Sequence, residues 1–355
     1  MAPRVLHLSP THFDAGSVLG GAERYCLELA RAMSGRVPTR LVSFGSASSV
    51  RREGGLEIRI LKSFRMEKDP LSPLAPALLR ELAWAEVIHL HQVHSLPADL
   101  ALLLGAVSAR RIFATDLGGG ARWALSYHLP LLKAVRAFLE ITEYAASFPR
   151  KAGWTVRVIG GGVGADRFSA AAARHRERVV LFVGRLLPHK GVEDLIDAGL
   201  PARVVGSALD GAYHQRLLDR ARGKPLRFEL GLSDAELVEA YRTAAVTVLP
   251  SVELTRDGRR VEKSELLGQT LLESMACGTP VVCTCVGGMP EVVEGSGAGT
   301  VVAPSDPAAL REALLGWLDA PSPVREEAGL AGRRHVLGQF RWEQVVRRCL
   351  EAYSA

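Results

Sequence analysis

Residues 265–286 read ELLGQTLLESMACGTPVVCTCV. The first part predicts a helix from near Gly268 to Cys277, because Gly278 is the glycine expected just past a helix end and Pro280 cannot continue a helix. The apolar run 281–286 then predicts a strand. A helix that turns directly into a bare apolar strand is typical of α/β proteins with parallel sheets.

Further strand-length apolar runs alternate with helical patterns along the whole chain. They cover residues 5–8, 41–44, 87–90, 112–114, 156–159, 179–183, 204–205, 246–249 and 300–302. These strands are too many for one typical sheet, and 355 residues suit two domains. We therefore expect an α/β fold of two doubly wound Rossmann-like domains. The glycine-rich run 160–164 predicts a hinge between a domain of residues 1–160 and one of residues 165–339.

Composition and charge exclude several classes of protein. With 48% hydrophobic residues the chain is too apolar to be disordered. Residues 1–160 hold 20 Lys and Arg against 13 Asp and Glu, whereas residues 161–355 hold 24 against 25. No basic run with interleaved aromatic residues occurs, so we expect no nucleic-acid partner. The positive first half instead favours an anionic or membrane-borne partner.

The five cysteines form no CxxC pair, and the CxC at 283–285 has no nearby residues to complete a metal site. They predict buried thiols in a reducing compartment. No apolar run reaches 18 residues and no signal-peptide core precedes the first strand. We expect a cytoplasmic protein, with peripheral contact at the inner membrane face through its basic first half.

Two carboxylates flank the start of the predicted helix 268–277. If the whole stretch were helical, Glu265 and Glu273 would lie about 12 Å apart. Between them, the free N–H groups of the helix N-terminus favour phosphate, and Gly268 lets the backbone approach it closely. Carboxylates accept hydrogen bonds from hydroxyls, so the segment suits a nucleotide sugar. An ordinary amphipathic helix with two solvated glutamates remains the alternative.

A second motif is Gly184-Arg185, followed by Lys190-Gly191, at the end of the predicted strand 179–183. Arg185 and Lys190 therefore emerge at the carboxyl edge of a parallel sheet, where open α/β folds bind ligands. Together they suit a diphosphate group. The chain has no Asp-x-Asp motif, which favours a mechanism without a metal ion. A surface ion pair in a loop is the alternative.

In these motifs the sequence resembles the family 4 retaining glycosyltransferases, which have the two-domain GT-B fold. The resemblance spans nearly the whole chain. Its residues are Gly20-Gly21-Ala22-Glu23-Arg24, His89-Leu90-His91, Gly184-Arg185 with Lys190-Gly191, Leu249-Pro250-Ser251, Glu265 with 273–282, and 286–292.

The resemblance implies a role for each matching residue. Arg185 and Lys190 match the pair that holds the donor diphosphate, Glu265 the acidic residue near the donor sugar, Glu273 the ribose ligand, and His91 a histidine tied to catalysis. The other donor-binding positions that it implies are Gly20, Gly21, Gly184, Ser251, Leu267, Gly268 and Gln269. The segment 340–355 resembles the helix that crosses back to the first domain in this fold.

The expected function is transfer of a sugar, with retention, from a UDP- or GDP-sugar to a hydroxyl of a glycan, a lipid or a small molecule. We expect no cofactor and no metal ion. The second domain should bind the donor and the first the acceptor, with the reaction in the cleft between them. Acceptor-side candidates are Asp116, Gly119 and His94. The alternatives are a nucleotide-sugar-binding protein with weak turnover and a GT-B nucleotide-sugar epimerase.

Two features depart from the family pattern. The run 160–164 replaces a common Pro-Asn-Gly-Val-Asp signature, which suggests a looser hinge. The segment 252–264 is a charged insert that borders the predicted donor site. Its arginines and lysine, Arg256, Arg259, Arg260 and Lys263, are candidates to bind an anionic donor or acceptor.

Overall fold

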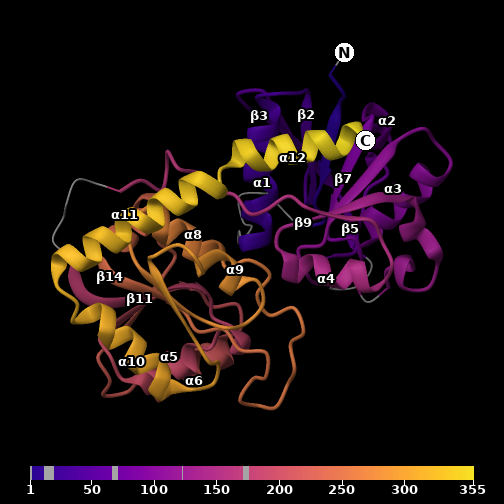
Figure 1. Ribbon diagram of the computed structural model, residues 1–355. Helices are drawn as coiled ribbons and strands as arrows, with labels where there is room; N and C mark the ends of the chain where they lie inside the picture. The colour runs from indigo at the N-terminus through magenta and orange to yellow at the C-terminus, as the bar shows by residue number, and fades with distance from the viewer. Residues whose placement is uncertain (1, 12–19, 66–70, 122, 171–175) are drawn as a thin grey trace. The chain divides into compact units, whose positions relative to one another are not determined.

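The computed structural model describes residues 2–11, 20–65, 71–121, 123–170 and 176–355. The chain forms two compact units: unit 1 is Met1–Gly162 with Trp342–Ala355, and unit 2 is Val163–Arg341. Each unit contains its own largely parallel sheet with helices packed against it (Figure 1). The predicted α/β fold with two Rossmann-like domains is therefore confirmed. Among the described residues, no helix is both long enough and apolar enough to cross a bilayer.

Unit 1 is built on an eight-stranded sheet in the order β10-β9-β8-β7-β1-β2-β4-β3, in which only the edge strand β3 is antiparallel. Its strands are β1 (Val5–Leu8), β2 (Thr39–Gly45), β3 (Ser49–Glu53), β4 (Leu56–Lys62), β7 (Val87–His91), β8 (Arg111–Thr115), β9 (Val135–Glu140) and β10 (Val156–Val158), with a small pair β5 (Phe64–Arg65) and β6 (Pro73–Leu74). Its helices are α1 (Gly21–Ser34), α2 (Leu78–Trp84), α3 (Leu96–Ala106), α4 (Glu143–Lys151) and α12 (Trp342–Ser354), with 3₁₀ turns η1 (Leu125–Tyr127) and η2 (Pro130–Ala134).

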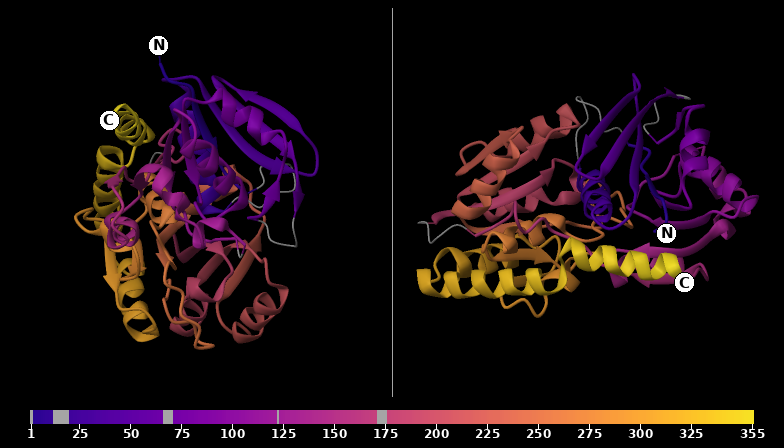
Figure 2. Two further views of the ribbon diagram at one scale, coloured as in Figure 1. Left: turned by 90° about the vertical axis from the view of Figure 1, so that its right-hand side faces the viewer. Right: turned by 90° about the horizontal axis from the view of Figure 1, so that it is seen from above.

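The C-terminal helix α12 belongs to unit 1, where it packs against α1 (Figure 2). The glycine run that precedes unit 2 is shaped by this helix. A Cβ at Gly162 would lie 2.4 Å from the indole of Trp342, and one at Gly160, where φ is +88°, would lie 2.8 Å from Nη1 of Arg348. Arg348 also donates to the carbonyl of Ile159. Close packing against α12 therefore gives these glycines a reason other than a loose hinge.

Unit 2 has a six-stranded, fully parallel sheet in the order β13-β12-β11-β14-β15-β16. Its strands are β11 (Glu177–Arg185), β12 (Ala202–Ser207), β13 (Leu226–Leu230), β14 (Ala244–Leu249), β15 (Val281–Thr284) and β16 (Gly299–Val302). Its helices are α5 (Val192–Ala198), α6 (Gly211–Arg220), α7 (Asp234–Thr243), α8 (Gln269–Ala276), α9 (Met289–Val293), α10 (Pro307–Leu318) and α11 (Ser322–Gln339), with the 3₁₀ turn η3 (Pro188–Lys190).

The stretch 265–286 folds as predicted into a helix, α8, and a strand, β15. Gly278 has a φ of +75° just after the helix, which is the left-handed conformation that a glycine adopts cheaply. Both elements are almost wholly buried, so they form the centre of unit 2. Of the cysteines, four are buried as expected, whereas Cys285 is exposed and corrects the prediction for that residue.

Candidate active site

The loop after β11 brings two cations to the carboxyl edge of the unit 2 sheet. Arg185 ends the strand and is exposed, and Lys190 closes the turn η3. Gly191 follows with a φ of +67°, and a Cβ there would lie 1.8 Å from the carbonyl oxygen of Pro250. Only glycine fits this close approach, which holds the Lys190 loop against the loop after β14.

Lys190 contacts Glu265 directly, although 75 residues separate them. The ammonium Nζ lies 2.5 Å from Oε2 of Glu265, and the two side chains are only 13% and 12% exposed. Ser251 donates its hydroxyl to the same oxygen at 3.4 Å, and the backbone N–H of Gly268 donates to Oε1 at 3.2 Å. An ion pair so far removed from water gives little net stability, so its presence in a loop fits a binding site better than a structural one.

The N-terminus of α8 lies beside this ion pair and has no side-chain cap. Its N-cap is Gly268, with a φ of +84°, and no acidic residue stands in the first turn. Nearby, the hydroxyl oxygens of Ser264 and Thr270 are buried without a hydrogen-bond partner in the described part of the chain. Uncapped N–H groups and free hydroxyls are what an anion would satisfy.

Cations surround His189 at the same edge. The pKa of His189 is lowered to about 4, mainly by burial and next by the charge of Lys190. Arg185 and Arg259 lower it further, whereas Glu265 raises it. The imidazole is therefore neutral near pH 7, and the surrounding charge is positive. Of the insert arginines, Arg259 thus lies close enough to the site to act on its electrostatics.

Glu273 occupies the middle of α8 and is only 3% exposed. Tyr241 donates its hydroxyl to Oε2 of Glu273 at 2.9 Å. Glu265 precedes the helix and Glu273 lies within it, as the sequence indicated. Leu267 is buried in the loop between them, and Gln269 begins the helix; Gly184 lies one residue before the end of β11.

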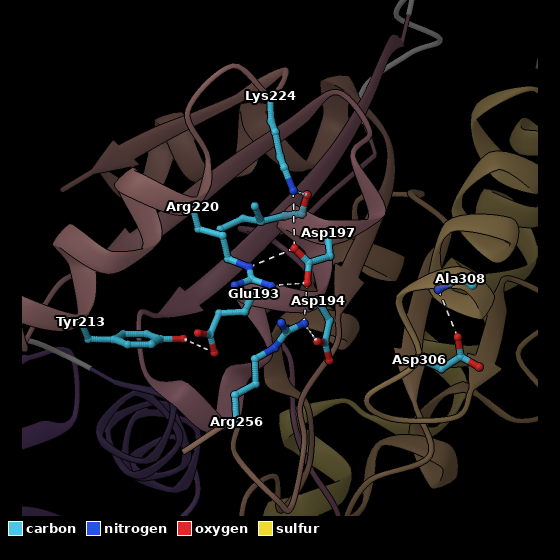
Figure 3. Close-up of polar contacts among 10 residues, drawn as sticks. Glu193, Asp194, Asp197, Tyr213, Arg220, Lys224, Arg256, Asp306 and Ala308 are labelled. Carbon is cyan, nitrogen blue, oxygen red and sulfur yellow. Dashed lines mark hydrogen bonds and ion pairs between the residues drawn. The ribbon is translucent and has the colours of Figure 1, made fainter. Parts of the chain in front are cut away.

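Arg256 of the charged insert does not point to an incoming ligand, which corrects the expectation for this residue. Figure 3 shows its guanidinium between two carboxylates of α5, at 2.5 Å from Asp194 and 2.6 Å from Asp197. Arg220 and Lys224 also pair with Asp197. Burial disfavours its charge, but Arg220 and Arg256 outweigh that effect and lower the pKa of Asp197 to about 2. Arg256 therefore anchors the insert to α5.

In unit 1, His91 ends β7 and is buried. Asp116 follows β8, accepts from the N–H of Gly118 at 3.2 Å, and is 9% exposed. Gly119 has a φ of +78°, with the Gln92 amide nitrogen 3.8 Å from the position of a Cβ. The carboxyl ends of β7 and β8 thus bring the predicted acceptor-side loop next to the segment after His91.

The predicted site residues His94, Gly20 and Gly21 make local contacts within unit 1. His94 stacks on Tyr127, with ring centroids 4.0 Å apart, and its Nδ1 lies 3.1 Å from the hydroxyl of Ser126. Gly20 is the N-cap of α1, and its N–H donates to Glu23. Gly21 is the first helical residue, and a Cβ added there would have no described atom within 4 Å beyond its chain neighbours and its own helix backbone.

Sequence reasoning missed His7 and Gln92. His7 is fully buried on β1 and lies within hydrogen-bond distance of His91. A histidine inside a short, otherwise apolar strand was a signal, because such positions rarely hold a polar residue. Gln92 has a φ of +72°, which is uncommon for a residue other than glycine, and its amide donates to the carbonyl of Gly118. No pattern in the neighbouring sequence predicts the positive φ of Gln92.

The Glu265 loop gives a steric prediction. A Cβ at Gly287 would lie 1.7 Å from the carbonyl oxygen of Glu265, so Gly287→Ala must displace this loop. We expect a loss of about 2–4 kcal/mol in unfolding free energy, from overpacking and left-handed strain, together with weaker nucleotide binding. Gly295→Ala is the matched control, since its φ is +75° but nothing lies within 4 Å of its Cβ. Urea unfolding and calorimetry measure both effects; equal losses in the two variants would contradict the steric argument.

Comparison with known proteins finds similarity to glycosyltransferases. Residues 165–335, nearly all of unit 2, match the family model described as glycosyl transferases group 1. The D-inositol 3-phosphate glycosyltransferase of Geodermatophilus obscurus is 28% identical, over 99% of this chain and 88% of that protein. A glycogen synthase of Mycobacterium tuberculosis is 32% identical over 56% of this chain, but only 48% of that protein is covered.

Solved structures match the fold over the full length. The sucrose-phosphate synthase of Thermosynechococcus elongatus has a TM-score of 0.79 at 20% identity, covering 99% of this chain and 98% of that one. The Anabaena protein HepE, solved in complex with UDP and glucose, has a TM-score of 0.74 at 17% identity, covering 99% of this chain and all of that one. Residues 165–335 thus carry a domain of the glycosyl transferases group 1, which supports a glycosyltransferase enzyme, and the two Rossmann-like units have the GT-B fold of the solved structures.

Proposed function

We propose that the chain transfers a sugar from a nucleoside diphosphate sugar to a hydroxyl group, with retention of the anomeric configuration and without a metal ion. The observation that carries the proposal is the group at the carboxyl edge of the unit 2 sheet: Arg185, the Lys190–Glu265 ion pair and the uncapped N-terminus of α8. A UDP- or GDP-sugar is the expected donor. A relative solved with UDP and glucose supports this class of donor.

Each part of this group suits one part of the donor. Lys190 has three N–H donors, so it can keep its contact with Glu265 while another donor turns to a phosphate oxygen. The guanidinium of Arg185 can bind the diphosphate through two parallel hydrogen bonds. In this proposal Glu265 accepts a hydrogen bond from a hydroxyl of the donor sugar, and Glu273 accepts one from the ribose.

Metal independence is proposed because the chain supplies the positive charge itself. Arg185, Lys190 and the N–H groups of α8 would stabilise the negative charge that develops on the leaving diphosphate. Retention is proposed as departure of the diphosphate and attack by the acceptor on the same face, with a leaving-group oxygen accepting the acceptor's proton. No protein nucleophile is needed for this route.

We assign the acceptor to unit 1, at the carboxyl ends of β7 and β8. His91 ends β7, and Asp116 and Gly119 lie in the loop between β8 and η1. The acceptor is a glycan, a lipid-linked molecule or a small molecule with a free hydroxyl. The excess of positive charge in residues 1–160 supports an anionic acceptor or contact with an anionic membrane surface from the cytoplasmic side.

The test is a turnover assay with UDP-, GDP- and ADP-sugars and a panel of hydroxyl acceptors in buffer containing EDTA. We expect release of nucleoside diphosphate with one donor class, and NMR of the product should show the donor's anomeric configuration. An inverted product would disprove retention, and activity that disappears with EDTA and returns with Mg²⁺ would disprove metal independence. Absence of turnover with every donor and acceptor would argue against the proposal as a whole.

A further inference from the structure

Three histidines form a buried cluster in the sheet of unit 1. The parallel pairing of β1 with β7 sets His7 beside His89, and His91 lies two residues further along β7 on the same face. Their exposed fractions are 0%, 0% and 1%. The ring centroids are 4.6 to 5.3 Å apart, so each ring contacts the other two.

The hydrogen bonds divide this cluster into a saturated histidine and a pair. Tyr353 and Thr115 occupy the two ring nitrogens of His89, each at 2.7 Å. His7 and His91 instead contact each other, with 3.0 Å between Nδ1 of His7 and Nε2 of His91. Their outer nitrogens, Nε2 of His7 and Nδ1 of His91, are buried without a partner in the described part of the chain.

The charge state of the pair limits what it can do. Burial lowers the pKa of His7 to about 3 and holds the pKa of His91 well below its usual range, with His7 adding to the effect on His91. Both rings are therefore neutral at physiological pH, and each carries one N–H and one bare nitrogen. The 3.0 Å contact contains one hydrogen, so the tautomer of His7 dictates that of His91 and thereby whether Nδ1 of His91 donates or accepts.

The alternative interpretation is that the three histidines bind a metal ion, because one ring nitrogen of each lies within 4.8 Å of the others. The geometry favours the hydrogen bond. Two nitrogens bound to one tetrahedral Zn²⁺ at about 2.0–2.1 Å would be roughly 3.3 Å apart, beyond the observed contact. His89 would also have to give up Tyr353 or Thr115 to become a ligand.

We propose that His7 is a positioning residue for the transfer reaction: its hydrogen bond orients the ring of His91 and fixes the tautomer that His91 presents through Nδ1. This inference rests on the proposed function, in which His91 serves the reacting sugars. His7 itself touches no substrate. A residue that acts in this way should affect turnover and not the affinity for the donor, which unit 2 binds.

The test compares three variants of the full-length chain. His7→Leu removes the hydrogen bond and fills the position with an apolar side chain. His7→Asn keeps a polar partner for His91. Tyr353→Phe removes the hydroxyl that contacts His89 and leaves the His7–His91 pair intact. We expect kcat to fall about 10- to 100-fold in His7→Leu, with recovery of part of the loss in His7→Asn and little change in Tyr353→Phe. The affinity for nucleoside diphosphate should stay within about twofold of wild type in all three, because none of the substitutions touches the group in unit 2 that binds it.

A second measurement does not depend on activity. ¹⁵N NMR of histidine-labelled protein, with the His91 signals assigned through a His91→Asn variant, reports the tautomer of His91 directly. We expect one tautomer in wild type and in Tyr353→Phe, and a changed or mixed state in His7→Leu; if His7→Leu does not fold, His7→Asn takes its place. An unchanged tautomer, or equal loss of kcat in Tyr353→Phe, would overturn the proposal.

Metal analysis completes the test. A stoichiometric metal ion in the purified protein that is lost on substitution of any of the three histidines would replace the proposed hydrogen bond with a metal site. The NMR result also separates this inference from the proposed function. A chain that transfers no sugar at all would disprove the function, whereas the His91 tautomer would still decide whether His7 controls it.

Discussion

Lys190→Ala is expected to weaken nucleoside diphosphate binding about 100-fold. Loss of a charge-assisted hydrogen bond to phosphate costs about 1.5–3 kcal/mol, and the free carboxylate of Glu265 would then face the phosphates without its counter-ion. Both effects act in the same direction, which places the expected loss near the upper end of that range. Isothermal titration calorimetry on wild type and variant measures it.

Two further variants sharpen this result. Arg178→Ala is the matched control, because Arg178 pairs with Asp319 in an exposed ion pair of the same unit and should leave nucleotide affinity unchanged. Lys190→Ala combined with Glu265→Gln removes the repulsion, so it should recover part of the affinity and remain at least about tenfold weaker than wild type. An unchanged affinity in Lys190→Ala would remove Lys190 from the phosphate site.

His91→Ala is expected to reduce kcat by about 100-fold or more, while the affinity for nucleoside diphosphate stays close to that of wild type. The physical reason is that the proposed donor-binding residues Arg185, Lys190 and Glu265 belong to unit 2, whereas His91 ends β7 of unit 1. Steady-state kinetics and calorimetry on one preparation give both numbers.

The substitution also leaves Nδ1 of His7 without its partner and creates a cavity, so part of the effect could be structural. His91→Asn, which retains a polar group in less space, should show the same loss of kcat with a smaller loss of stability. Full activity in either variant would exclude His91 from the reaction. Loss of nucleotide affinity together with kcat would show instead that unit 1 governs donor binding.

The centre of unit 2 could be predicted from sequence because its signals are local. Gly278 and Pro280 end α8, and a bare apolar run makes β15. In contrast, β13 was missed because its residues LRFEL form no continuous apolar run, although they alternate apolar and charged side chains with the two-residue period of a half-buried strand. β4 was also missed, although the buried residues Leu56, Ile58 and Ile60 follow the two-residue period of a strand.

The sequence predicted that Lys190 and Glu265 bind the same nucleotide-sugar donor, but it did not predict that they contact each other. This contact depends on two loops at the edge of one sheet, 75 residues apart in sequence. The expectation for Arg256 failed for the same reason, since its partners lie about 60 residues earlier on α5. The pairing of β1 with β7, which joins His7 to His91, is likewise a product of topology that spacing along the chain does not reveal.

The most direct test of the central claim is a calorimetric titration of wild-type protein with UDP, GDP and ADP in buffer containing EDTA. We predict that one of them binds with a stoichiometry of one per chain. The matching monophosphate should bind about tenfold more weakly or worse, because Arg185 and Lys190 lose a phosphate to contact. Failure of all three diphosphates to bind, or equal binding of the mono- and diphosphate, would contradict the assignment of a donor diphosphate site to unit 2.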